Sequence, residues 1–121
     1  MSKNKITIPP EKLALYDKLI ASQPDMERKG ATVPYTSLNG HMFTFLSKEG
    51  VLGIRLSKDD REAFLQKFNT GLMEQHSTVM KEYVQVPAGL LADTETLTLY
   101  VRKSYDYIKT LKPKPTRKKA K

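Results

Sequence analysis

The sequence predicts an α+β fold: an antiparallel sheet of about four strands, a three-strand meander plus one more, with an N-terminal and a C-terminal helix packed on it. Three observations support this. Residues 32–56 hold three short apolar segments separated by two turn sequences. Apolar residues at helical spacing occur both before and after these strands. The 121 residues include no cysteine, so an apolar core rather than disulfides must hold the fold.

The first helix is expected to begin at Pro9-Pro10-Glu11, because proline fits the first turn, where the amides have no partner within the helix. The helix should end near residues 21–24. Its apolar residues recur every three or four positions and should pack on the sheet: Leu13, Tyr16, Leu19 and Ile20.

The meander is marked most clearly by Asn39-Gly40, since a two-residue type I′ turn needs positive φ at both central positions. A second turn at residues 47–50 leads to a third strand at residues 51–56. If Leu46 pairs with Val51, one face of the sheet is the core face and carries Phe43, Phe45, Leu52, Ile54 and Leu56. Thr44, Gly53 and Arg55 then point to the opposite face. That second face would carry apolar residues as well, which makes it a candidate interaction face: Val33, Tyr35, Met42, Leu46 and Val51.

The rest of the folded part follows from caps and alternation. Ser57 is expected to cap a helix that ends near residue 69, and residues 72–78 fit either a loop or a helical turn. Residues 79–86 alternate as a fourth strand, which Pro87 ends. Asp93 or Thr94 should cap a last helix that runs to about residue 111.

The net charge of +8 is concentrated at the C-terminus. Residues 112–121 hold six of the 21 basic residues and no acid, which leaves 15 basic and 13 acidic residues in residues 1–111, a net of +2. We therefore expect a folded domain over residues 1–111 and a disordered basic tail over residues 112–121. The tail is suited to phosphate contacts that carry no sequence information, through Lys112, Lys114, Arg117, Lys118, Lys119 and Lys121.

No catalytic, nucleotide-binding or metal-binding motif is recognisable, so no cofactor is expected. His41 and His76 are the two histidines, and their spacing does not match a zinc site. Arg55 is expected to pair with a surface acid rather than bind an anion. Tyr100, Lys103 and Tyr107 share a strip of the last helix that fits ordinary packing better than base stacking.

Several of these segments resemble the N-terminal domain of the bacterial competence regulator TfoX (Sxy). The resemblance rests on residues 39–43, residues 50–56, Tyr83-Val84-Gln85-Val86-Pro87 and Leu90-Leu91-Ala92-Asp93, and covers about residues 10–110. It implies a small cytoplasmic α+β domain of bacteria. Members with a second domain are linked to transcriptional control of DNA uptake. The first strand departs from the glycine-rich aromatic motif that is usual in this family.

Together these features favour a non-enzymatic regulatory or protein-binding module in the cytoplasm, with an unidentified protein partner or a second copy as in a homodimer. The alternative is a small nucleic-acid-binding protein that uses its basic tail. An enzyme would require a deep pocket that encloses His41 or His76 together with a carboxylate. No apolar segment approaches the length that spans a membrane.

Overall fold

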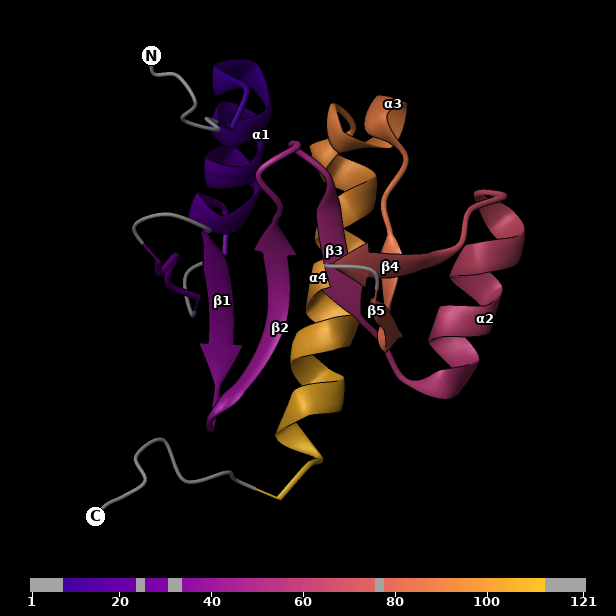
Figure 1. Cartoon of the computed structure of the whole chain (residues 1–121). Helices are drawn as coiled ribbons and strands as arrows, with labels where there is room; N and C mark the ends of the chain where they lie inside the picture. Colours follow the sequence, from indigo (N-terminus) through magenta and orange to yellow (C-terminus); the bar gives the residue numbers. More distant parts are fainter. Residues whose placement is uncertain (1–7, 24–25, 31–33, 76–77, 113–121) are drawn as a thin grey trace.

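Helices and strands follow one another in the order α-β-β-β-α-β-β-α-α in the computed structural model of the chain, which describes residues 8–23, 26–30, 34–75 and 78–112 (Figure 1). The elements are α1 (Pro10–Ala21), β1 (Tyr35–Leu38), β2 (His41–Leu46), β3 (Leu52–Arg55), α2 (Lys58–Lys67), β4 (Leu72–Gln75), β5 (Thr78–Gln85), α3 (Ala88–Leu91) and α4 (Thr94–Lys109).

The five strands form one sheet in the order β1-β2-β3-β5-β4, and every pair of neighbours is antiparallel. The predicted α+β class, the antiparallel sheet and the two terminal helices are thus confirmed. The sheet has one strand more than expected, because β4 lies in the stretch that the sequence left open between loop and helix. Its residues pair with β5, and Gln75 is opposite Thr78.

The first hairpin has the predicted turn. Asn39 has φ of 55° and Gly40 has φ of 83°, the positive values that a type I′ turn requires. The β1–β2 register then shifts, since Thr36 pairs with Thr44 whereas Ser37 pairs with Met42. Phe43 is the additional residue of this bulge, which changes the direction of the strand.

The second hairpin corrects the predicted register. Leu46 pairs with Leu52, and not with Val51 as predicted. The physical reason lies in the turn: the Ser47 amide donates to the Val51 carbonyl at 2.9 Å, and Gly50 adopts a positive φ of 84°. Ser47 and Val51 therefore close a three-residue loop, in which the glycine takes the left-handed position.

This one-residue difference exchanges residues between the two faces, because directly opposed residues share a face. Thr44 lies opposite Ile54, and its hydroxyl is 2.9 Å from the Tyr16 hydroxyl of α1, so this set faces the helices. Phe45 lies opposite Gly53 and is on the other face. The placement of Phe45 on the core face and of Thr44 and Leu46 on the second face was therefore wrong.

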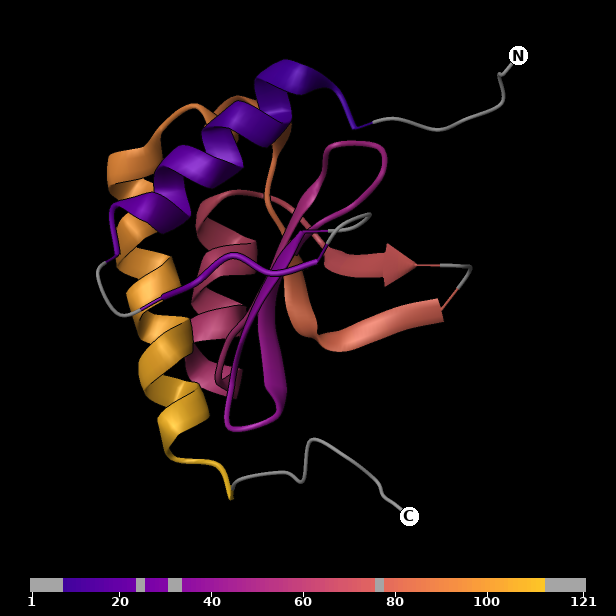
Figure 2. The ribbon, with the colours of Figure 1, turned by 90° about the vertical axis from the view of Figure 1, so that its left-hand side faces the viewer.

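The helices α1, α2 and α4 lie on one side of the sheet (Figure 2). The main core lies between them and the sheet, where Leu46, Leu52 and Ile54 are 0–1% exposed. Tyr100 of α4 packs its ring against Phe64 of α2, with ring centroids 4.9 Å apart. The main core also contains these large buried side chains: Tyr16, Leu19, Phe43, Leu56, Phe64, Leu97, Val101 and Ile108.

Three hydroxyl groups are buried together within this core. Thr44 Oγ1 lies 2.9 Å from the Tyr16 hydroxyl and 2.6 Å from Thr36 Oγ1. Burial raises the pKa of Tyr16 to about 12. Each hydroxyl satisfies another, which is why polar groups are tolerated between α1 and the sheet.

Both predicted caps are present. The Ser57 hydroxyl accepts from the Asp60 amide at 3.4 Å, and Asp93 accepts from the Thr96 amide at 3.2 Å. Among the described residues, no helix combines the length and the apolar character needed to cross a membrane.

Candidate functional site: the open face of the sheet

The side of the sheet opposite the helices, called the open face below, is not covered by any described helix (Figure 2). Its members follow from the register, because Tyr35 and Gly53 are each opposite Phe45, and Met80 is opposite Met73. A side chain on Gly53 would point at both Phe45 and Met73, which places Met73 on the same face. The apolar members of the open face are Tyr35, Met42, Phe45, Gly53, Met73, Met80 and Tyr83. By the same register it also carries Ser37 opposite Met42, Arg55 opposite Tyr83, and Gln85 opposite Gly53.

Gly53 allows the centre of this face to be filled by rings from the neighbouring strands. A Cβ atom on Gly53 would lie 2.8 Å from Cε1 of Phe45. The rings of Phe45 and Tyr83 meet edge to face with centroids 5.7 Å apart. The Tyr83 hydroxyl then donates to the Met42 carbonyl at 2.6 Å, so Tyr83 of β5 reaches across β3 to β2. Burial raises the pKa of Tyr83 to about 12.

The β4–β5 hairpin extends from the sheet on the side away from the helices (Figure 2). The β4–β5 register shifts between Leu72 and Met73, and among the described residues β5 pairs with β3 only at residues 83–85, so the hairpin beyond these residues pairs only within itself. Residues 72–75 and 78–81, called the hairpin arm below, therefore stand beside the open face. Val79 on this arm is 46% exposed, and it is one of two large hydrophobic residues that are so exposed among the described residues.

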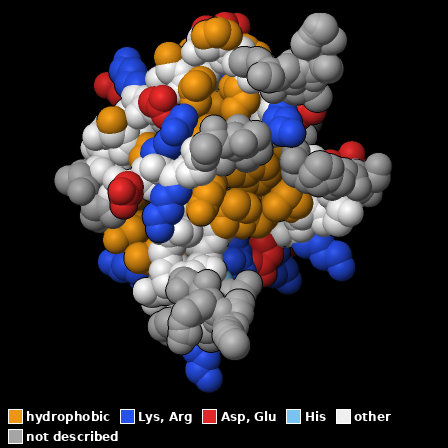
Figure 3. Space-filling model, turned by 60° about the vertical axis from the view of Figure 1, so that its left-hand side comes forward, with side chains coloured by type: hydrophobic (Ala, Val, Ile, Leu, Met, Phe, Trp, Pro, Cys, Tyr) orange, Lys and Arg blue, Asp and Glu red, His pale blue; other side chains and the backbone are white. Residues whose placement is uncertain are grey.

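The exposed surface agrees with this assignment. Seen obliquely from the β1 side, hydrophobic side chains gather in the centre of the surface, and Lys and Arg side chains border them (Figure 3). Tyr35, Met42, Met80 and Tyr83 are half-buried, whereas Phe45 and Met73 beneath them are 3% and 2% exposed. The apolar residues of the open face thus form a half-buried layer over a packed base.

Of the residues predicted for an interaction face, the structure brings two onto the open face, Tyr35 and Met42. Leu46 is fully buried under the helices and does not belong to it. Val51 is half-buried beside the β2–β3 turn, where its amide donates to Ser47 Oγ at 3.1 Å. Val33 lies outside the described residues.

The basic tail is described only at its first residue. Lys112 is exposed, and its carbonyl oxygen lies 2.8 Å from Nε2 of His41, which joins the end of the helical part to the β1–β2 hairpin. His41 is therefore an edge histidine with a structural contact. The remaining predicted tail residues lie outside the described ranges, as does His76: Lys114, Arg117, Lys118, Lys119 and Lys121.

The other candidate residues have structural partners. Arg55 is paired with Glu82, with Nε and Oε1 2.6 Å apart, as predicted. Its guanidinium also lies 5.9 Å from the Tyr107 ring. Tyr100 is 8% exposed within the core, and Lys103 lies 3.9 Å from Asp60. This agrees with the expected packing role of the strip on α4.

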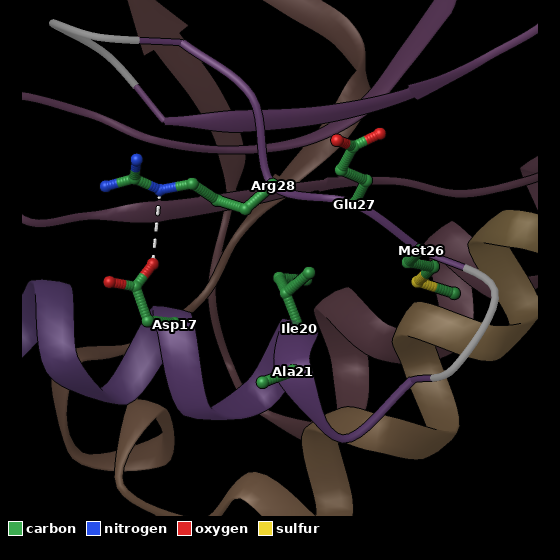
Figure 4. A pocket seen from close by; sticks show the side chains of 6 residues that line it. All are labelled: Asp17, Ile20, Ala21, Met26, Glu27 and Arg28. Atoms are coloured by element: carbon green, nitrogen blue, oxygen red, sulfur yellow. Dashed lines mark ion pairs between the residues drawn. The ribbon is translucent and has the colours of Figure 1, made fainter.

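A hollow of about 470 Å³ lies beside α1, where the chain passes from Met26 to Arg28 (Figure 4). Arg28 Nε is 3.2 Å from Asp17 Oδ1 across it, so these two charges neutralise each other, and Glu27 is the third charged side chain of the lining. His41 is not among its lining residues, which are Asp17, Ile20, Ala21, Met26, Glu27 and Arg28. Within the described part of the chain, no group of three or more His, Asp or Glu side chains is placed to hold a metal ion.

Sequence reasoning missed most of the open face, namely Phe45, Met73, Met80 and Tyr83. Part of the signal was present, since Gly50 after Lys48-Glu49 fits the three-residue loop that sets the correct register. Comparison of the chain with protein-family models, with curated proteins and with solved structures found no match.

Proposed function

We propose that this protein is a non-enzymatic regulatory module of the cytoplasm that binds another protein through the open face. The observation that supports this most is the apolar, aromatic and methionine-rich surface opposite the helices. Binding surfaces of this kind are enriched in tyrosine, phenylalanine and methionine and poor in charge at their centre.

The packing beneath the surface supports a binding role as well. Tyr83 is held by its hydrogen bond to the Met42 carbonyl and by its contact with Phe45, so its ring loses little freedom when a partner docks. Met80 and Met42 are flexible and polarisable, and such side chains adapt to the shape of a partner. The surface therefore combines a rigid aromatic centre with adaptable neighbours.

The resemblance to the TfoX N-terminal domain is part of the same proposal. It favours a bacterial protein with a regulatory role, carried out through protein contacts rather than through chemistry on a substrate. The segments behind the resemblance include Tyr83-Val84-Gln85-Val86-Pro87, and Tyr83 contributes directly to the open face.

Photo-crosslinking in living cells tests this proposal. A photoreactive phenylalanine analogue is placed at position 79 on the hairpin arm, and in a matched variant at position 99 on α4. Val79 and Leu99 are 46% and 53% exposed, so both positions accept a bulky group without loss of the fold. We expect discrete crosslinked species at position 79 and none at position 99. Equal labelling at both positions, or none at either, would contradict binding at the hairpin arm beside the open face.

A second candidate function is charge-driven binding of nucleic acid by residues 112–121. The observation in its favour is the separation of charge, with six basic residues and no acid in that segment and a net charge of +2 elsewhere. The test is the binding of duplex DNA and of RNA by the full chain and by residues 1–111 across a salt series. Tail-dependent binding with a steep salt dependence supports this function. Equal binding by both chains, or by neither, contradicts it.

A further inference from the structure

We infer that the partner on the open face is a second copy of this chain, arranged so that the hairpin arm of each copy lies on the open face of the other. This inference rests on the proposed function. It adds the identity of the partner and the element that makes the contact. Three features of the described residues lead to it.

The first feature is that the two surfaces which need a partner lie on the same molecule. The open face is uncovered by described helices. The arm beside it exposes Val79, which is opposite Glu74 and therefore lies on the side of the arm that faces away from Met73 and Met80. In a two-fold arrangement of two copies, the arm of the first copy lies on the open face of the second. By symmetry, the arm of the second copy then lies on the open face of the first. One symmetric contact therefore buries both surfaces.

The second feature is charge. Residues 1–111 carry 15 basic and 13 acidic residues, so two folded parts meet with little mutual repulsion. Arg55, which is opposite Tyr83 on the open face, pairs with Glu82. The segment 113–121 is a poor occupant by comparison. It holds five Lys or Arg residues and no large apolar side chain to place against tyrosine and methionine.

The third feature is the protected edge of β1. The Lys29 amide donates to the Tyr35 carbonyl at 2.7 Å, and the Tyr35 amide donates back to the Lys29 carbonyl at 2.9 Å. These bonds occupy the outer edge of β1 at Tyr35, which disfavours sheet extension by another strand at this point. The contact between copies is therefore expected face to face rather than edge to edge.

The size of the contact predicts a weak dimer. With strands about 4.8 Å apart and about 3.4 Å per residue, the open face of β1, β2, β3 and β5 projects to roughly 300 Å². The arm adds roughly 130 Å² by the same geometry. Two copies would thus bury on the order of 900 Å², below the roughly 1,200–2,000 Å² of stable complexes. We expect exchange between monomer and dimer rather than a permanent dimer.

Sedimentation equilibrium of the full chain over a wide concentration range tests this inference. It compares the natural sequence with Val79→Lys on the arm and with Leu99→Lys on α4, a matched control because both residues are large, apolar and exposed. Far-UV circular dichroism confirms that all three are folded. We expect concentration-dependent dimers for the natural sequence and for Leu99→Lys, and dissociation that is at least about tenfold easier for Val79→Lys, since a lysine resists burial in an apolar contact. Raising the salt concentration should not weaken the dimer, because its contacts are apolar.

Each other outcome overturns the inference. A monomer at every concentration removes the second copy as partner. A dimer that Leu99→Lys dissociates and Val79→Lys does not uses α4 instead. The crosslinking experiment separates failure of this inference from failure of the proposed function. A product at position 79 with a mass other than twice that of the chain keeps the hairpin arm beside the open face as a binding site and identifies a different protein on it.

Discussion

Gly53→Ala is the sharpest test of the packing on the open face. The new methyl carbon would lie 2.8 Å from Cε1 of Phe45 and 3.3 Å from Cγ of Met73, and contacts below 3.0 Å force atoms to move. Phe45 has little room to move, because it is 3% exposed and the Tyr83 ring lies against it. Overpacking of this kind costs about 1–3 kcal/mol, and the restricted ring favours the upper half of this range.

Gly71→Ala provides the matched control. No atom lies within 4 Å of a Cβ atom built on Gly71, so the same change there meets no neighbour. It should alter the free energy of unfolding by less than about 1 kcal/mol, with stabilisation the more natural direction, because alanine restricts the unfolded chain. Any general effect of replacing glycine is thereby separated from the contact with Phe45.

Urea unfolding followed by far-UV circular dichroism measures both variants. With an m-value of about 1–3 kcal/mol/M, a loss of about 2–3 kcal/mol lowers the midpoint by roughly 0.7–3 M. Gly53→Ala combined with Phe45→Leu should cost less than the sum of the two single changes, because the smaller side chain makes room. If Gly53→Ala and Gly71→Ala have equal midpoints, Phe45 does not lie over Gly53, and the register that defines the open face is refuted.

Three further predictions concern the remaining polar groups. Thr44→Val should lower the free energy of unfolding by about 2–3 kcal/mol, because Thr44 is the shared partner in the buried hydroxyl cluster. Tyr16→Phe should lower it by only about 1 kcal/mol, because Thr44 then remains bonded to Thr36. Equal losses in urea unfolding would contradict this. Asp93→Ala should lower the urea midpoint at pH 7 through loss of the α4 cap. Its hydrogen bonds to the Thr96 side chain and amide hold the pKa of Asp93 below 3.8, so this contribution is present above pH 3.8 and is lost as the pH falls below it; a difference between the two proteins that persists at pH 2 would argue against the cap. Burial raises the pKa of Tyr16 and Tyr83 to about 12, so the stability they contribute is complete below pH 10 and is lost as the pH rises toward 12. Absorbance titration should show a late ionisation that accompanies unfolding and is reduced by Tyr16→Phe and by Tyr83→Phe, and a titration curve that neither change alters above pH 10 would refute their burial.

The local features of the chain could be predicted from the sequence because each depends on a few neighbouring residues. Asn39-Gly40 specifies its turn through the backbone freedom of two residues. Ser57 and Asp93 specify helix starts through bonds to amides three residues away. The helical stripe of α4 was readable for the same reason, since Leu97, Val101, Ser104 and Ile108 follow its period.

Features that join distant segments could not be predicted with the same certainty. In the sequence alone, Phe43 and Phe45 are equivalent members of one alternating strand. The bulge after Thr36 and the pairing of Leu46 with Leu52 place Phe43 against α4 and Phe45 on the opposite face. A shift of one residue in the register reverses every side chain of a strand, so a small error in a turn becomes a large error in a surface.

The candidate site shows the same division between sequence and structure. By itself, the sequence determined the α+β class, the turns, the caps and the presence of more apolar strand residues than one core face needs. Only the tertiary structure decided which of them form the open face, because the pairing of β3 with β5 joins residues about 30 positions apart and brings Tyr83 to Phe45 and Met73 to Gly53. Local hydrogen bonds are encoded within a few positions, whereas a surface built from five strands depends on the register of every pair between them.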